Sequence, residues 1–549
     1  MLQCRYQRTG EMADLEEAIE MARQAVKSTP YDHPDRASYL GNLGNDLWHR
    51  YKQTGEMADL EEASLYFYNT WHCQIAIPFS RVKAAARCLT LPVAQAKMDT
   101  AIQLGQDVID LLLAVNTKLL DRSDQQFVMS IFAGVATNVC SFLLASNRPT
   151  NALEYLEKGR AVIIGQLVDA RSDFSSLEQQ YPDIARRYMY LRDEVNTPVN
   201  RLEQDIGQAQ VIGRRREAVA ELDACIREIR GIAGNERFLL GTIVVVNITG
   251  LRSDAILVSQ AAIKALNLPR LLASDALKNR EYLEYLTWLW DVCVKPILDE
   301  VRSTNDGANG LPRIWWIGAG LGSSMPFHAA GVHSPGSTEN VFSRTISSYT
   351  PSIKALGYAQ HRSRATGTHV RLASDPTMPT TPSQGLQSDA RKPPDLPGVV
   401  EEKKRIANVM NTYMSIEPLD LPNQGEGQEA EQDRLTVHRI SELSLPHAYI
   451  AYLSACSTAE NNSTKLSDEV IHVVSGFQVA GFPHAVGCLW PSFDRVCADV
   501  ASKFYQSLQG AIRWDGRAVA YAVREAVLAA REAEMEMPLA WAQFVHFGA

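Results

Sequence analysis

A segment near the start of the chain occurs twice, and this repetition limits the folds open to the amino-terminal half. Arg5–Ala18 recurs as Arg50–Ala63, displaced by 45 residues from position 5 to position 50, and only two of the fourteen positions differ. A fixed period of this length is typical of helical repeat proteins, in which each repeat is a helix pair that packs on the next pair. The repetition therefore predicts an array of helices.

Each repeat carries the signals of two helices joined by a turn. Gly10 and Gly55 mark the turn, and Asp14 and Asp59 are predicted to cap the helix that follows it. The pattern stays helical, without further repetition, from about residue 80 to about residue 230. We therefore predict a helical repeat region over residues 1–235.

These repeats resemble the tetratricopeptide-like repeats of fungal proteins, although the unit is longer than the common form. The resemblance implies a concave face that binds proteins or peptides, which is an expectation from fold-level analogy. The alternative, of equal weight, is that these helices only support the second half of the chain.

The pattern changes at Phe238, after which short apolar strands alternate with helices. The predicted strands are Thr242–Ile248, Ala255–Ser259, Arg313–Gly318, Thr345–Ser352, His369–Ala373 and Ala485–Trp490. Such alternation predicts a largely parallel sheet covered by helices on both faces. We therefore predict an α/β domain over residues 236–549.

Two stretches inside this domain have the composition of exposed, flexible loops. Residues 374–397 are rich in Pro, Ser and Thr, and residues 415–433 are rich in Gln and Glu. Neither stretch has the apolar pattern of a core element.

Cys456 is the candidate nucleophile of this domain. The run Ala448–Thr458 begins with strand-forming apolar residues and ends in small residues, so Cys456 lies at or just past the carboxyl end of a buried strand. Functional groups of open α/β sheets lie beyond such ends, and a thiol there is a candidate for covalent catalysis. The alternative, which residue type and position alone favour, is a small buried cysteine that only packs.

Composition argues against several classes of protein and site. A net charge of −9 disfavours a general nucleic-acid binder. The nine cysteines include no Cys-x-x-Cys pair, so we expect neither a zinc site nor a disulfide framework. No Gly-Lys-Ser/Thr follows the glycines near residue 320, so we expect no phosphate loop. We expect no metal and no cofactor. We also expect no membrane span, because no apolar run approaches the roughly 20 residues that a span needs. Scattered cysteines and the lack of an apolar signal core predict a reducing, cytoplasmic location.

Several motifs of the second half together resemble the CHAT domain, the caspase-like domain commonly found behind tetratricopeptide repeats. They are Met325–Ala330, Tyr349–Ser352, Leu396–Glu402, Tyr452–Thr458, Ala480–Trp490 with Asp494, and Trp541–Phe544. The resemblance covers roughly residues 236–549. It implies a caspase- and separase-type fold and a cysteine endopeptidase with a Cys–His pair, in which Cys456 attacks the carbonyl carbon.

The catalytic histidine of that family is missing from its expected place. The family carries it in a His-Gly pair between the Leu-Pro-Gly motif and the cysteine strand, where this chain has only His438 and His447, and none of its twelve histidines precedes a glycine. The strand that carries the family's histidine is therefore expected to be deleted. A gap would leave backbone groups unpaired, so we expect either a shifted sheet, in which the neighbouring strands close up, or an irregular region around residues 415–440.

His328, in the motif Met325–Ala330, is the candidate substitute base. His447 and His484 are expected at the wrong end of their strands, and His438 on a surface helix. Asp468 and Glu469 follow Cys456 by about a dozen residues. They could line a pocket for a basic substrate residue, although solvated charges are the simpler interpretation.

Two functions follow from these observations. The first is a caspase-like cysteine endopeptidase with a protein-binding helical array, catalytically impaired because the His-Gly segment is missing. The alternative is a non-enzymatic scaffold for protein–protein interaction with a degenerate caspase-like domain. The substrate, the activating signal and the oligomeric state stay open.

Overall fold

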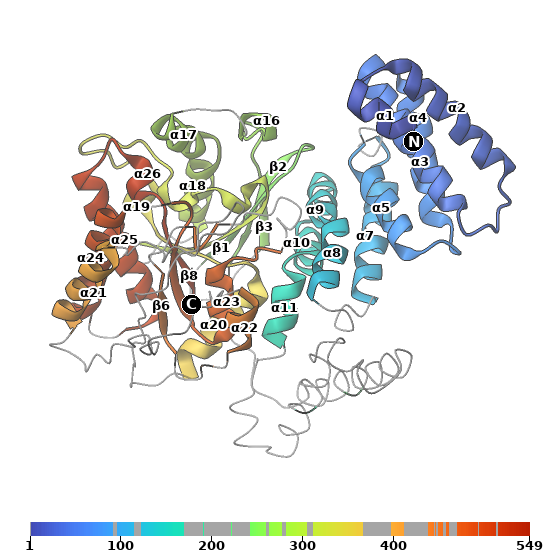
Figure 1. Ribbon diagram of the computed structural model, residues 1–549. Helices are drawn as coiled ribbons and strands as arrows, with labels where there is room; N and C mark the ends of the chain where they lie inside the picture. The colour runs from blue at the N-terminus through green and yellow to red at the C-terminus, as the bar shows by residue number, and fades with distance from the viewer. Residues whose placement is uncertain are drawn as a thin grey trace. The chain divides into compact units, whose positions relative to one another are not determined.

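The computed structural model has the predicted fold class, a helical array followed by an α/β domain with a mostly parallel, mixed sheet (Figure 1). The described residues form two compact units, of which the first ends at Arg160 and the second begins at Ala161. The predicted domain boundary at residues 235 and 236 lies outside the described residues. The structure describes residues 2–91, 96–114, 122–169, 190, 221, 242–259, 263–276, 281–304, 311–365, 397–410, 437–443, 445, 448–453, 457–460, 469–491, 493–511 and 514–549.

The described part of the first unit consists of helices. They are α1 (Leu2–Thr9), α2 (Met12–Ser28), α3 (Arg36–Thr54), α4 (Met57–His72), α5 (Pro78–Leu89), α7 (Met98–Ala114), α8 (Arg122–Phe132), α9 (Val135–Ala145) and α10 (Pro149–Gly159). Consecutive helices pack against each other from α1 to α5, as expected for an array of helix pairs. The assignment to tetratricopeptide-like repeats stays a prediction.

The two copies of the repeated segment have the same local geometry. Gly10 and Gly55 each have a φ of 74°, and each donates its N–H at 2.7 Å to the carbonyl four residues earlier. This left-handed cap ends the helix, because glycine adopts a positive φ without steric cost. The predicted turns are confirmed.

The predicted caps of the following helices are wrong. Asp14 and Asp59 lie inside the first turn and are buried. Each carboxylate binds the arginine nine residues earlier, with Nε–Oδ2 distances of 2.7 Å from Arg5 and 2.8 Å from Arg50. A bidentate guanidinium–carboxylate pair thus joins the two helices of each pair. In the sequence, this pair is marked by an arginine nine residues before each aspartate, and the preference of aspartate for helix caps takes no account of such a partner.

One apolar stretch of the first unit is as long as a membrane-spanning helix. Gln126–Ala145 has 20 residues with a mean hydropathy of 1.9, so by length and composition it could span a bilayer, and the expectation that no such run exists is wrong. In the structure the stretch is interrupted at Gly134, whose φ of 80° separates α8 from α9. Of its residues, 61% are buried within the protein, as in a core helix.

The second unit is built on one eight-stranded sheet in the order β3-β2-β1-β4-β5-β8-β7-β6. The strands are β1 (Thr242–Ile248), β2 (Ser253–Val258), β3 (Ile263–Asn267), β4 (Arg313–Gly320), β5 (Ile346–Tyr349), β6 (Ile450–Tyr452), β7 (His484–Cys488) and β8 (Phe544–Gly548). β1, β4, β5 and β8 are parallel, whereas β7 is antiparallel to β8 and parallel to β6. The cysteine strand β6 therefore runs opposite to β4 and β5.

Helices cover both faces of the sheet (Figure 1). The helices of the second unit are α11 (Val162–Asp169), α16 (Ala273–Ala276), α17 (Tyr282–Leu289), α18 (Lys295–Thr304), α19 (Val341–Arg344), α20 (Ile353–Ala365), α21 (Pro397–Met410), α22 (Val437–Glu442), α23 (Val473–Ala480), α24 (Asp494–Gln509), α25 (Gly516–Ala533) and α26 (Pro538–Trp541). A π-helical turn, Trp290–Val294, joins α17 to α18. One face packs against this turn, α18 and α23, and the other against α21, α24 and α25.

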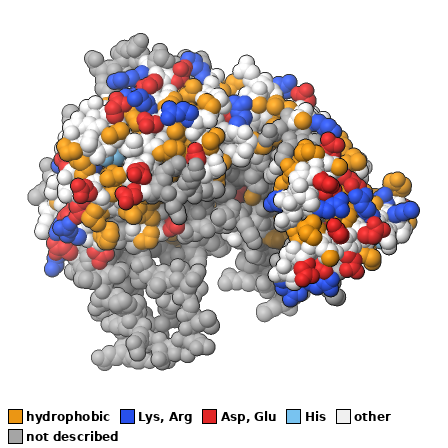
Figure 2. Space-filling model, turned by 90° about the horizontal axis from the view of Figure 1, so that it is seen from above, with side chains coloured by type: hydrophobic (Ala, Val, Ile, Leu, Met, Phe, Trp, Pro, Cys, Tyr) orange, Lys and Arg blue, Asp and Glu red, His pale blue; other side chains and the backbone are white. Residues whose placement is uncertain are grey.

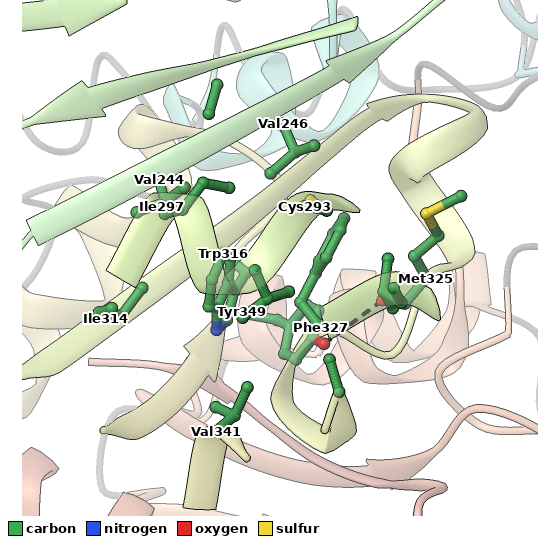
Figure 3. Close-up of a cluster of buried hydrophobic side chains, with 14 of the residues drawn as sticks. Val244, Val246, Cys293, Ile297, Ile314, Trp316, Met325, Phe327, Val341 and Tyr349 are labelled. Atoms are coloured by element: carbon green, nitrogen blue, oxygen red, sulfur yellow. Dashed lines mark hydrogen bonds between the residues drawn. The ribbon is translucent and has the colours of Figure 1, made fainter. Parts of the chain in front are cut away.

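Trp316 and Phe327 lie at the centre of the first of these two cores (Figure 3). Their rings are stacked with centroids 5.3 Å apart, and neither side chain is exposed. Phe327 belongs to the short 3-10 turn Phe327–Ala329, which follows β4 and carries His328. Burial of this aromatic pair thus holds the turn with His328 against the sheet.

The described strands form one continuous sheet without a gap. β8, which the sequence analysis did not predict, lies between β5 and β7. β6 is an edge strand of the described sheet, and a strand lost beside it would leave the pairing of the other strands intact. The predicted strand at residues 369–373, the predicted loops and residues 415–436 lie outside the described residues.

Replacing Asp59 with alanine is expected to destabilise the first unit by about 2 kcal/mol, because it leaves the Arg50 guanidinium without its charged acceptor. Asp59 is only 3% exposed. The measurement is urea unfolding of the full chain followed by circular dichroism. Glu61→Ala, an exposed change on the same helix, is the control, and equal effects of the two changes would contradict the structural role of the pair.

Candidate functional site

The candidate nucleophile follows the edge strand β6. Cys456 itself, with Ser454 and Ala455, lies outside the described residues, so its place is defined by its neighbours Leu453 and Ser457. Leu453 continues β6 and donates its N–H to the Val486 carbonyl at 2.8 Å, and Ser457 has a φ of 58°. A positive φ in a serine indicates a sharply turned backbone directly after Cys456. The predicted strand before Cys456 is confirmed.

Thr458 anchors this turn to the carboxyl end of β7. Its hydroxyl donates to the Leu453 carbonyl at 3.3 Å and accepts the Cys488 N–H at 3.0 Å. The Ala459 N–H donates to the Cys488 carbonyl at 2.9 Å. The chain after Cys456 is thus bound to Cys488, the last residue of β7, and Leu453 before Cys456 is bound to Thr458 and to Val486 of the same strand.

Helix α23 closes the far end of the same loop. The Val474 N–H donates to the Thr458 carbonyl at 3.0 Å. His472 caps the helix, because its Nδ1 accepts the Ser475 N–H at 3.0 Å. A Cβ on Gly487 would lie 2.5 Å from Val474 Cγ2 and 2.9 Å from Thr458 Oγ1, so only glycine lets the helix and the loop approach β7 this closely.

His328 is buried in the wedge between β5 and β8. Only Tyr349 and Phe547 pair in register between these strands. A cavity of about 20 Å³, which could hold one water molecule, is lined by His328 together with Ser347 of β5 and His546 of β8. The backbone N–H of His328 donates to the Tyr349 hydroxyl at 3.1 Å, and the ring Nδ1 of His328 lies 3.0 Å from the same hydroxyl.

Burial determines the protonation of His328. The side chain is 5% exposed, and burial lowers its pKa from 6.5 to about 3 because the imidazolium would lose its hydration. His328 is therefore neutral at pH 7. A base with so low a pKa gives little driving force for proton transfer from a thiol.

Two strands separate the element that binds His328 from the cysteine strand. Tyr349, Phe547, Ala485 and Ala451 form one row across β5, β8, β7 and β6. At about 4.8 Å per strand spacing, the backbones at the two ends of this row lie about 14 Å apart. Because Cys456 lies outside the described residues, its distance from His328 is not defined, and the role of His328 as a substitute base stays a prediction.

Other histidines form a buried polar chain at the opposite end of β7. His484 is the first residue of that strand, and its Nδ1 lies 3.2 Å from His546 Nε2. His546 Nδ1 lies 2.8 Å from the Ser348 hydroxyl, which accepts from Arg313 at 3.0 Å. Burial lowers the pKa of His484 to about 3, and the Arg313 charge adds to this effect. As the sequence analysis expected, His484 is remote from the carboxyl end of β7.

Of the other candidate residues, Asp468, Glu469, His438 and His447, the structure describes the side chain of Glu469 alone. Glu469 is 3% exposed and hydrogen-bonded to the backbone, so it is not a solvated charge. Asp468 and His447 lie outside the described residues, as does the side chain of His438 on α22. Among the described residues, no group of three His, Cys, Asp or Glu side chains is arranged to hold a metal ion.

The comparison with known families and structures bears on the carboxyl-terminal part. Residues 419–549 match the CHAT domain family. This segment contains β6, the Thr458 anchor, α23, β7 and β8, and the match supports the caspase-like part of the prediction there. No curated protein sequence matches the chain.

Among solved structures, the chain is similar to one described as the Saccharomyces cerevisiae separase–securin complex. The TM-score is 0.39 and the sequence identity is 11%. The alignment covers 99% of this chain and 46% of the other, so this chain spans less than half the length of that protein.

Acidification is expected to destabilise the second unit through its buried histidines. The folded pKa of His328 and of His484 is about 3, below the unfolded value near 6.5, so the unfolded state takes up protons first as the pH falls. Below pH 6.5, each such histidine lowers the free energy of unfolding by about 1.4 kcal/mol for every pH unit of acidification.

The measurement is urea unfolding between pH 7.5 and 5.5, followed by tryptophan fluorescence. His328→Gln is expected to reduce the mean slope over this range by about 0.7 kcal/mol per pH unit, because the unfolded histidine is half protonated on average between pH 7.5 and 5.5. The control is His33→Gln at an exposed position of the first unit. An unchanged slope for His328→Gln would show that His328 is protonated with equal ease in both states.

Proposed function

We propose that this protein is a protein-binding scaffold whose carboxyl-terminal domain resembles caspase-like cysteine peptidases and is catalytically impaired in this sequence. The observation that carries the proposal is the state of His328, the one candidate substitute base. It is buried, bound to Tyr349 and neutral, with a pKa of about 3. A catalytic Cys–His pair instead needs an imidazole that can take the thiol proton near neutral pH.

The surface of the helical array supports the binding role. Leu65, Ile75, Ile77 and Phe127 are between 56% and 65% exposed on or beside helices α4, α5 and α8. Exposed aliphatic and aromatic side chains on an array are suited to a protein or peptide partner. In Figure 2 hydrophobic, basic and acidic side chains are interspersed on the face shown.

The partner class follows from the same features. With a net charge of −9, a protein or peptide suits the array better than a nucleic acid. The described cysteines Cys73, Cys88 and Cys293 are free thiols, and a reducing, cytoplasmic location is part of the proposal.

The second candidate function is an active cysteine endopeptidase. The CHAT match at residues 419–549 supports it, because Cys456 lies within the matched segment. It requires a base that acts on Cys456 in place of the missing histidine. The reactivity of the thiol decides between the two functions.

The deciding measurement is the alkylation rate of Cys456 against pH, with Cys456→Ala as the control for the other eight thiols. An unpaired thiol has a pKa near 8.5, so the rate is expected to rise about 150-fold between pH 6 and pH 8.5. Fast alkylation at about pH 6 that is lost in His328→Gln would overturn the proposal and establish a working Cys–His pair.

A further inference from the structure

The side of helix α5 that faces solvent combines an aromatic and two basic side chains. Phe79, Lys83 and Arg87 recur every four residues, and all three are exposed. Residues four apart in a helix lie one above the other, so these three side chains form a single stripe. The opposite side of the helix, with Val82 and Leu89, is buried in the array.

An aromatic pair extends this stripe onto the neighbouring helix α8. The rings of Phe79 and Phe127 are stacked, with centroids 5.5 Å apart and an interplanar angle of 11°. Phe127 is nevertheless 58% exposed, and Ile75 and Ile77, in the turn before α5, are 60% and 65% exposed. Exposed apolar side chains are therefore concentrated at the amino-terminal end of α5, as at a protein-binding surface.

The charges that follow this apolar end are positive and available to a partner. Residues 63–98 contain four Lys or Arg and no Asp or Glu, although the whole chain has a net charge of −9. In the preceding helix pair, Arg50 is neutralised by Asp59. Lys83 and Arg87, by contrast, form no ion pair with any residue that the structure describes.

Helix α3 adds positive charge beside α5. Burial lowers the pKa of His49 on α3, and the charges of Arg87 and Lys52 lower it further. This effect requires both cations to lie close to the His49 ring, so Lys52 of α3 and Arg87 of α5 flank one neutral imidazole. A partner that is attracted to this part of the array therefore carries negative charge.

We propose that this surface, here called the α5 face, binds an acidic segment of a partner protein that carries one large apolar anchor. The α5 face consists of Ile75, Ile77, Phe79, Lys83, Arg87 and Phe127. The anchor covers the Phe79–Phe127 pair, and carboxylates pair with the two cations. Binding at the α5 face rests on the proposed protein-binding role and adds the chemistry of the partner to it.

The geometry of α5 sets the spacing of the partner's residues. Lys83 and Arg87 follow Phe79 by four and eight residues, which at about 1.5 Å per residue is roughly 6 Å and 12 Å along the helix axis. An extended peptide that lies along α5 covers about 3.3 Å per residue. Its acidic residues are therefore expected two and four positions from the apolar anchor.

The test measures the binding of three fluorescein-labelled peptides to the full chain by fluorescence anisotropy. The acidic peptide has a central Phe with Glu two and four positions away on either side, in a background of Gly and Ser. In the neutral and the basic peptide, Gln or Lys replaces every Glu. The unchanged chain is expected to bind the acidic peptide about tenfold more tightly than the neutral one, because ion pairs with Lys83 and Arg87 are added.

Variants of the chain locate the binding surface. Lys83→Glu combined with Arg87→Glu is expected to reverse the preference toward the basic peptide. Lys27→Glu combined with Lys503→Glu reverses the same number of exposed charges elsewhere and is the matched control. Phe127→Ser is expected to weaken the binding of all three peptides about tenfold, because part of the apolar contact is lost. Circular dichroism checks that each variant is folded.

Equal binding of the acidic and the neutral peptide would overturn the assignment of an acidic partner and leave the protein-binding role of the array intact. Absence of binding by all three peptides would count against both. A control variant that loses the preference as the Lys83→Glu, Arg87→Glu variant does would show a general charge effect and overturn the assignment. If that α5 variant does not fold, the peptide comparison on the unchanged chain carries the test.

Other occupants of the α5 face give different results. A single-stranded oligonucleotide that binds more tightly than the acidic peptide, and whose binding Phe127→Ser weakens, would assign the face to a nucleic acid. A dimer that Phe127→Ser dissociates, measured by sedimentation, would assign it to a second copy of this chain. Either result would overturn the acidic partner.

Discussion

The pairing of β8 with both β5 and β7 is the constraint on which the second unit depends. Five residue pairs join β8 to β7, but only Tyr349 and Phe547 pair between β8 and β5. Side chains reinforce the short pairing of β8 with β5, because the Trp315 indole N–H donates to the Gly548 carbonyl at 2.8 Å and the Ser348 hydroxyl is hydrogen-bonded to His546 Nδ1. A few residues at the end of the described chain therefore hold the two halves of the sheet together.

This joint also determines where the candidate site can lie. Because β8 is parallel to β5 and antiparallel to β7, the strands β6 and β7 run opposite to β4 and β5. β6 is an edge strand of the described sheet, and His328 lies on the far side of two intervening strands. A lost strand beside β6 would remove a base from the edge and leave the rest of the fold stable.

The loop after Cys456 is held by contacts that come from three separate parts of the chain. Thr458 binds β7, α23 binds Thr458, and Glu469 binds α11. Its geometry is thus linked to the helix that directly follows the first unit, although this helix is far from the loop in the sequence.

The sequence by itself determined the features that depend on local patterns of residues, namely helices, turns and most of the strands. The repeated segment predicted the helix pairs and the turns at Gly10 and Gly55, and apolar runs predicted β1, β4, β5, β6 and β7. The missing His-Gly pair was also visible, because a dipeptide needs no tertiary context. Only the tertiary structure decided the place of β8, the burial of His328 and the role of Glu469. Each of these depends on partners that lie outside the local segment, and strand order, burial and long-range hydrogen bonds leave no periodic trace in the sequence.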